Sequence, residues 1–139
     1  MIHNSIEEFK TYTPILQVWD GVLAVPVIGI LDRERIQIVM EKLLGSLNSS
    51  GCTVAILDIS GVPTVNTEVA VQLLSIIEAV RLMGAECIIS GIRPEIALTL
   101  VNLDIDLKDI KSRPTMARAL EEALTTLGFK VVAQPEVAD

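Results

Sequence analysis

The chain has 139 residues, half of them hydrophobic and only 3% aromatic, with a formal net charge of −7. This length suits one domain that buries about two-thirds of its unfolded surface around an aliphatic core. The acidic balance disfavours binding to nucleic acid or to an anionic membrane. No apolar stretch reaches the roughly 18 residues that a membrane span needs, and the N-terminus lacks a signal-peptide pattern. We therefore expect a cytoplasmic domain with neither a nucleic-acid nor a membrane partner.

The cysteines and histidines of the chain indicate which catalytic and metal-binding sites it can form. Cys52 and Cys87 lie beside or within β-branched runs, and we expect two reduced thiols in the core; a disulfide between neighbouring strands is the alternative. His3 is the only histidine, and no metal-ligand spacing occurs. The sequence therefore predicts neither a His-based catalytic triad nor a metal or cofactor site.

The first elements form a hairpin pattern. Pro14–Val18 and Val22–Ile28 are predicted as extended segments joined by the turn dipeptide Asp20-Gly21. Pro26 would remove a donor from the second strand, which indicates a bulge or an edge position. Asp32 then has the character of an N-cap, and the apolar stripe that follows it predicts a helix ending at residues 48–51.

The rest of the chain alternates strands and helices. Two buried strands are expected at Thr53–Ile59 and Glu86–Ser90, with helices following from about Asn66 to Met83 and from Pro94 to about Leu103. Residues 104–111 are expected as a loop with at most a short strand, and Pro114 as the start of a last helix ending near Leu127-Gly128. The order β-β-α-β-α-β-α-(β)-α predicts an α/β fold. Its small mixed sheet begins with a hairpin, continues in parallel β-α-β units and packs against about four helices.

Two loops are expected at the same edge of this sheet. One spans residues 58–67 and the other residues 90–99, each after a parallel strand, where open α/β sheets place their working loops. Thr67 falls at the start of its helix, with Asn66 as the expected N-cap. Two interpretations stay open: these residues only cap the helix, or the Thr67 hydroxyl is an accessible site for a phosphate, which a helix N-terminus would stabilise.

The helix after the second loop has a polar face. Glu95, Thr99 and Asn102 follow at i, i+4 and i+7, so Thr99 is expected to face solvent. Arg93 precedes this helix, and we expect it to cap a neighbouring loop, with anion binding as the alternative.

The run LDISGVPTVNTEVA, followed by IISGIRPEIALTL, resembles the STAS domains of bacterial stressosomes, the sigma-factor regulators of the RsbR and RsbS type. The resemblance extends from about Pro14 to Phe129 and includes the opening PILQVWDG and the segment Gly29–Asp32. It implies a STAS domain at residues 14–129, an N-terminal extension or linker remnant at 1–13 and a tail at 130–139.

The resemblance also implies a function as a phospho-regulated anti-sigma factor antagonist. Thr67 matches the residue phosphorylated by a partner serine/threonine kinase of the histidine-kinase ATPase superfamily, and Thr99 matches a second threonine modified in the RsbR type, the type that this chain resembles more. The unphosphorylated family members hold the kinase, and phosphorylation releases it. Other STAS proteins, in a homodimer or larger assembly, and a phosphatase are the further partners. The expected partner-binding residues are Asp58, Ser60, Gly61, Asn66, Glu68, Arg93 and Glu95.

Two features depart from the family pattern. Family members usually carry Asp directly before the first phosphorylated residue, where this chain has Asn66. RsbR-type proteins also have a sensory domain before the STAS domain, whereas few residues precede Pro14, and Ser5–Thr11 could be the tail of a linker helix. We therefore expect either a stand-alone paralogue or a fragment of a longer protein.

Other function classes fit the sequence less well. A response-regulator receiver would use Asp58 as phospho-acceptor, but it also needs an acidic pair after its first strand, and this chain has none there; Asp58 is instead expected to hydrogen-bond the loop that follows it. A nucleotide-binding enzyme would need a glycine-rich phosphate loop of a known pattern, and none is present. A hydrolase using Ser60 or Ser90 would need a base, and no histidine lies near either.

Overall fold

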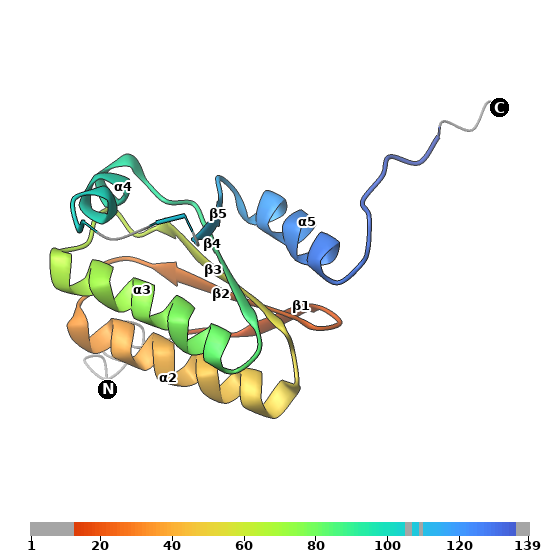
Figure 1. Cartoon of the computed structure of the whole chain (residues 1–139), viewed down its shortest axis with the longest axis horizontal. Helices are drawn as coiled ribbons and strands as arrows, with labels where there is room; N and C mark the ends of the chain where they lie inside the picture. Colours follow the sequence, from red (N-terminus) through yellow and green to blue (C-terminus); the bar gives the residue numbers. More distant parts are fainter. Residues whose placement is uncertain (1–12, 105–106, 109, 136–139) are drawn as a thin grey trace, which may run out of the picture.

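The computed structural model describes residues 13–104, 107–108 and 110–135. The described residues form a five-stranded sheet with four helices (Figure 1). The strands are β1 (Leu16–Trp19), β2 (Val22–Ile28), β3 (Val54–Gly61), β4 (Glu86–Ser90) and β5 (Lys111–Arg113). The helices are α2 (Arg33–Ser50), α3 (Thr67–Leu82), α4 (Pro94–Val101) and α5 (Met116–Thr126). The expected segments at residues 1–12, including Ser5–Thr11 and His3, lie outside the described residues, as do residues 136–139.

The strands lie in the sheet in the same order as in the sequence, β1-β2-β3-β4-β5. β1 pairs with β2 in antiparallel orientation, and each later pair is parallel with a helix in the crossover. The predicted mixed sheet with an opening hairpin is therefore confirmed. β2 lies between β1 and β3, but its pairing with β1 stops at Ala24, so Pro26 is paired with β3 alone. The register with β3 shifts between Pro26 and Ile28, which is the irregularity that the proline predicted.

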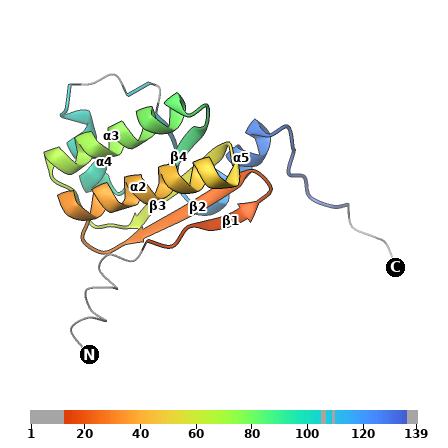
Figure 2. The ribbon, with the colours of Figure 1, turned by 90° about the horizontal axis from the view of Figure 1, so that it is seen from below.

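Helices cover both faces of the sheet. On one face, α2 and α3 lie side by side, and on the other lies α5 (Figures 1 and 2). The side chains of β3 alternate between the two cores: Ala55, Leu57 and Ile59 belong to the first, and Val54 and Ile56 to the second. Residues 54–59 are all buried, as expected for a central parallel strand made of one aliphatic run. β3 continues to Gly61, so it includes the first four residues of the loop expected at 58–67, and the loop expected at 90–99 begins at the last residue of β4.

Side-chain caps set the helix starts. The Asp32 carboxylate accepts a hydrogen bond from Arg35 N at 2.8 Å, and the Asn66 side chain accepts one from Val69 N at 2.8 Å, as expected for these two N-caps. The expected start of the last helix at Pro114 is wrong. Thr115 caps α5 by accepting a bond from Arg118 N, so the helix begins at Met116, two residues after the proline.

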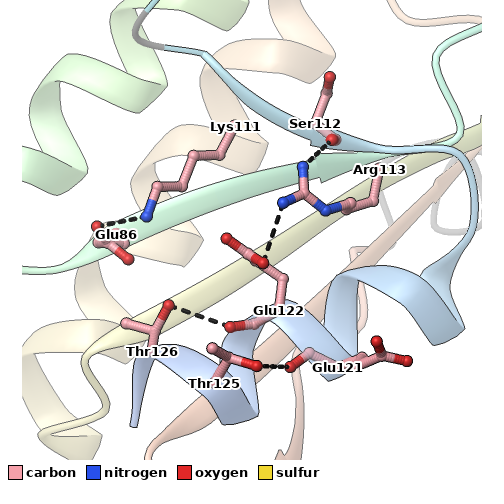
Figure 3. A network of polar contacts seen from close by, with 8 residues as sticks. All are labelled: Glu86, Lys111, Ser112, Arg113, Glu121, Glu122, Thr125 and Thr126. Carbon is pink, nitrogen blue, oxygen red and sulfur yellow. Dashed lines mark hydrogen bonds and ion pairs between the residues drawn. The ribbon is translucent and has the colours of Figure 1, made fainter. Parts of the chain in front are cut away.

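The short strand β5 begins at Lys111, the last residue of the segment expected as a loop with at most a short strand, and it ends at Arg113. Its charged side chains reach across the α5 side of the sheet (Figure 3). Lys111 Nζ lies 2.9 Å from Glu86 Oε1 on β4, and Arg113 pairs with Glu122 on α5 at 3.0 Å. Such partly exposed pairs contribute little each, about 0 to 1 kcal/mol, but they connect β5 to both of its neighbours.

Both cysteines are buried and free, so the expected core thiols are confirmed and the disulfide alternative is wrong. Burial raises the pKa of Cys87 to about 12, and nearby Arg81 opposes this only in part. The thiol therefore stays neutral near pH 7 and packs as a small apolar side chain.

Beyond α5, Phe129 contacts Trp19 edge-on with ring centroids 6.1 Å apart, and residues 130–135 extend away from the sheet. Within the part of the chain that the structure describes, no helix is long and apolar enough to cross a membrane.

Candidate phosphorylation site

The loops after β3 and β4 meet at the carboxyl edge of the sheet. We use the term carboxyl edge for residues 28–33, 60–68 and 90–99. Each range begins at the end of a strand (β2, β3 or β4) and runs into the helix that follows it. Because β3 and β4 are parallel neighbours with Asp58 opposite Ser90, the two predicted loops leave the sheet side by side. The sequence predicted this juxtaposition correctly.

Asp58 holds the start of both loops. Its Oδ1 accepts hydrogen bonds from the Ser60 hydroxyl at 2.6 Å and from Ser60 N at 3.1 Å, and its Oδ2 accepts one from the Ser90 hydroxyl at 2.5 Å. Asp58 is only 8% exposed and Ser90 is fully buried. A carboxylate with so little access to water depends on such bonds, and hydrogen bonds to charged acceptors are the stronger kind. The predicted role of Asp58, bonding the loop that follows it, is confirmed.

Gly91 and Arg93 add two further contacts between the loops. Gly91 has φ +74°, and a Cβ built on it would lie 2.5 Å from Ser60 Cβ, so the two backbones touch. Arg93 Nε donates a hydrogen bond to Ser60 O at 3.0 Å, which is the loop-capping role expected for this arginine. Ser60 is therefore contacted by Asp58, Gly91 and Arg93. These contacts fix the backbone at the point from which the chain continues to α3.

Thr67 is the first residue of α3 and is exposed. The Asn66 side chain caps the helix through Val69 N, so the cap does not use the Thr67 hydroxyl. The amide groups of the first turn and the positive end of the helix dipole lie at this point, where negative charge is stabilised. The arrangement contains what both earlier interpretations required: a capped helix and an accessible hydroxyl beside it.

Thr99 differs from the expectation of a solvent-facing side chain. Glu95 and Asn102 are exposed, but Thr99 is half-buried, and its hydroxyl donates to Glu95 O at 3.1 Å within α4. Two apolar side chains of the same helix, Leu98 and Val101, are exposed instead. Thr99 is therefore less accessible than Thr67, and the α4 surface is more apolar than the polar spacing suggested.

The structure adds the β2–α2 loop to the site, which the sequence did not indicate. Gly29 N donates to Gly61 O at 2.9 Å, so this loop borders the one that leads to Thr67. Arg35 fixes it by donating to the carbonyl oxygens of Ile28 and Ile30. Burial lowers the pKa of Arg35 from its ordinary value, and Asp32 opposes that effect. Both isoleucine side chains are exposed, Ile30 at 79%, and place an apolar surface beside the loop that leads from β3 to Thr67.

A salt bridge also crosses from this loop to α3. Arg33 Nε lies 3.2 Å from Glu68 Oε1, and both side chains are more than half exposed. The pair joins the first residue of α2 to the residue after Thr67. Among the described residues, no group of three or more histidine, cysteine or acidic side chains is arranged to hold a metal ion.

The family model of the STAS domain matches residues 13–123, which span the sheet and the carboxyl edge described above. The chain belongs to the STAS domain family. The resemblance drawn from the two loop motifs is thereby confirmed.

Relatives of this STAS domain include the RsbT co-antagonist protein RsbRA of Bacillus subtilis. The two are 40% identical over 123 residues, which are 88% of this chain and 45% of that protein. The chain thus spans less than half the length of this relative. Among solved structures, a variant of RsbS from Moorella thermoacetica matches with a TM-score of 0.74 and 25% identity over 84% of this chain and 98% of that one. A chain from a structure of the stressosome matches with a TM-score of 0.69 and 23% identity over 84% and 100%, which shows the shared fold.

The Gly91 contact predicts a large and local mutational effect. Gly91→Ala places a methyl group against Ser60 and forces alanine into a left-handed conformation, so the free energy of unfolding should fall by about 2 to 4 kcal/mol. Gly45→Ala is the matched control, because Gly45 lies in α2 with nothing within 4 Å of an added Cβ. It should raise stability by about 0.5 to 1 kcal/mol. Urea unfolding measures both, and an unchanged midpoint for Gly91→Ala would contradict the described packing.

Proposed function

We propose that this STAS domain, at residues 14–129, is a non-enzymatic, phospho-regulated interaction module of a stressosome-like partner-switching pathway in the cytoplasm. Thr67 is its main phosphorylation site and Thr99 a secondary one. Its partners are a serine/threonine kinase of the histidine-kinase ATPase superfamily, a phosphatase and other STAS domains in a homodimer or larger assembly. The observation that carries the proposal is the position of Thr67, exposed at the first turn of a helix whose entry is fixed by the Asp58 and Gly91 contacts.

The position of Thr67 suits a phosphate that is added and later removed. The hydroxyl is not consumed by capping, since Asn66 makes that bond. A phosphate there would carry about −1.5 to −2 charges beside the unpaired amides of the first turn, where it is stabilised without a change of fold. Because Thr67 lies on the surface and not in the core, the added charge would act mainly on whatever protein contacts the carboxyl edge.

Relatives support the same interpretation. RsbRA is named as an RsbT co-antagonist, and a chain of the stressosome shares this fold. We extend both to this chain as a proposal: binding to a kinase of the RsbT kind and assembly with further STAS domains. The partner-binding set then consists of Asp58, Ser60, Gly61, Asn66, Glu68, Arg93 and Glu95, of which Asp58 and Arg93 act by shaping the loops.

The receiver alternative loses support from the contacts of Asp58. A phospho-acceptor aspartate has to present a carboxylate oxygen to the incoming phosphate. Here both oxygens accept hydrogen bonds from Ser60 or Ser90, and the residue is almost fully buried. The carboxylate is committed to holding loops together.

Phosphate mapping tests the site assignment. Incubation with the cognate kinase and ATP, followed by mass spectrometry, should place most phosphate on Thr67 and a slower, smaller amount on Thr99, because Thr99 is half-buried and its hydroxyl is bonded to Glu95 O. Thr67→Ala should remove the main signal.

Thr125→Ala is the matched control, since Thr125 is an exposed helical threonine whose hydroxyl makes the same kind of bond, to Glu121 O at 3.0 Å. Its labelling pattern should equal that of the unaltered chain. Label that persists in the Thr67→Ala, Thr99→Ala double variant at the original level would refute both sites.

The exposed isoleucines of the β2–α2 loop should contribute to kinase binding. Ile30→Ser should weaken the affinity of the unphosphorylated domain for its kinase about tenfold, because a large apolar side chain beside the contacted loop is the kind of residue that anchors interfaces. Calorimetric titration measures this. Leu82→Ser is the control, since Leu82 is 89% exposed at the opposite end of α3 and should not change the affinity. Equal losses for the two variants would place the kinase elsewhere.

A further inference from the structure

We propose that phosphorylation of Thr67 transfers the Arg33 guanidinium from Glu68 to the phosphate, so that Arg33 is the counter-ion of the modified site. This inference rests on the proposed function, since it requires Thr67 to carry a phosphate. It assigns a role to a residue that neither the family motifs nor the sequence analysis had singled out.

The salt bridge between α2 and α3 provides the starting state. Arg33 Nε lies 3.2 Å from Glu68 Oε1, with side chains 77% and 54% exposed. Glu68 directly follows Thr67, so both residues lie in the first turn of α3. Successive side chains of a helix point about 100° apart, so the guanidinium has to swing from the Glu68 side to the Thr67 side to meet a phosphate. In this state the two charges neutralise each other at the surface beside Thr67.

The base of Arg33 is fixed, although its side chain lies in solvent. Asp32 caps α2 through Arg35 N, and Arg35 donates to two carbonyl oxygens of the preceding loop. The Cα of Arg33 therefore keeps its place opposite the start of α3. Only side-chain rotation is needed to exchange one acceptor for another, and in an exposed arginine this is fast.

A phosphate is the stronger competitor for the guanidinium. It carries about −1.5 to −2 charges and three acceptor oxygens, against one charge and two oxygens for a carboxylate, and guanidinium groups bind it in bidentate geometry. The acidic residues at the other helix starts do not hold Arg33 in the described structure. Asp32 is engaged as the α2 cap, and Glu34 and Glu95, in the first turns of α2 and α4, form no ion pair with Arg33 there. Asn66, on the other side of Thr67, is neutral.

The exchange would change the surface by more than the phosphate alone. Glu68 would lose its cation and stand as a carboxylate beside a phosphate that holds Arg33. A partner that binds the neutral Arg33–Glu68 pair would then contact a free carboxylate, which repels acidic groups. It would also lose its contact with the arginine, because that side chain has moved to the phosphate. Arg33 thus makes the phosphorylated surface differ in shape as well as in charge.

The pKa of the phosphate measures this contact directly. Phosphothreonine is installed at position 67 during synthesis of the full chain, without the kinase, and its second ionisation is followed by ³¹P NMR. A guanidinium at the phosphate favours the dianion, so Arg33→Gln should raise this pKa by about 0.2 to 0.7. The difference should shrink in about 1 M salt, because exposed charges are then screened.

Two variants serve as controls. Arg118→Gln removes an equivalent surface cation, paired with Glu121 at 2.9 Å on α5, and should leave the phosphate pKa unchanged. Glu68→Gln removes the competing carboxylate and should lower the pKa below that of the unaltered chain. An Arg33→Gln value equal to that of the unaltered chain would overturn the proposal, as would an equal rise in Arg118→Gln.

Failure of this test is separable from failure of the proposed function. Because the phosphate is installed chemically, an absent Arg33 effect says nothing about whether the kinase modifies Thr67. Conversely, if the kinase does not phosphorylate Thr67, the measured pKa difference between the variants remains, but the proposed function is wrong.

Discussion

The organisation of the carboxyl edge depends on one buried carboxylate. Asp58 accepts two hydrogen bonds from Ser60 and one from Ser90, and it does so at the point where the two central parallel strands end. A buried carboxylate without these bonds would be costly, so the loops that provide the donors are held to it. The Gly91 contact and the Arg93 bond to Ser60 O then follow, because Ser60 is already in place. A sequence feature that could suggest a phospho-acceptor thus turns out to be the anchor of the site.

Such an anchor gives the surface threonine a fixed setting. Thr67 lies six residues beyond the end of β3 at Gly61, yet its backbone position is determined by the loop contacts and by the Asn66 cap. Phosphorylation at a site of this kind adds charge without having to refold anything. The neighbouring segment between β2 and α2 adds two features to the site: exposed isoleucines that a partner can cover, and Arg33, which forms a salt bridge with Glu68 in the first turn of α3. In our proposal, the apolar part holds the partner and the charged part responds to the phosphate.

Much of this could be predicted from the sequence because the signals are local. The aliphatic runs of β3 and β4 and the caps Asp32 and Asn66 each depend on a few neighbouring residues, and the order of these elements forces the two loops to one edge. Local signals predict β5 only as an optional short strand, because it is polar, three residues long and held by β4 and two ion pairs. They miss the later start of α5, where Thr115 replaces Pro114 as the boundary. They also miss the salt bridge between Arg33 and Glu68, since only the packing of α2 against α3 brings these residues together. The local pattern likewise does not predict that Thr99 on α4 is half-buried.

In our proposal, phosphate on Thr67 decides whether the kinase stays bound. The most direct measurement is the affinity of the kinase for the domain with unmodified Thr67 and with phosphothreonine at that position, in the same buffer and salt. We predict a loss of at least about tenfold on phosphorylation, because a charge of about −2 enters the surface that we propose as the kinase contact. Equal affinity for the two forms would contradict the claim, even if the kinase were shown to modify Thr67.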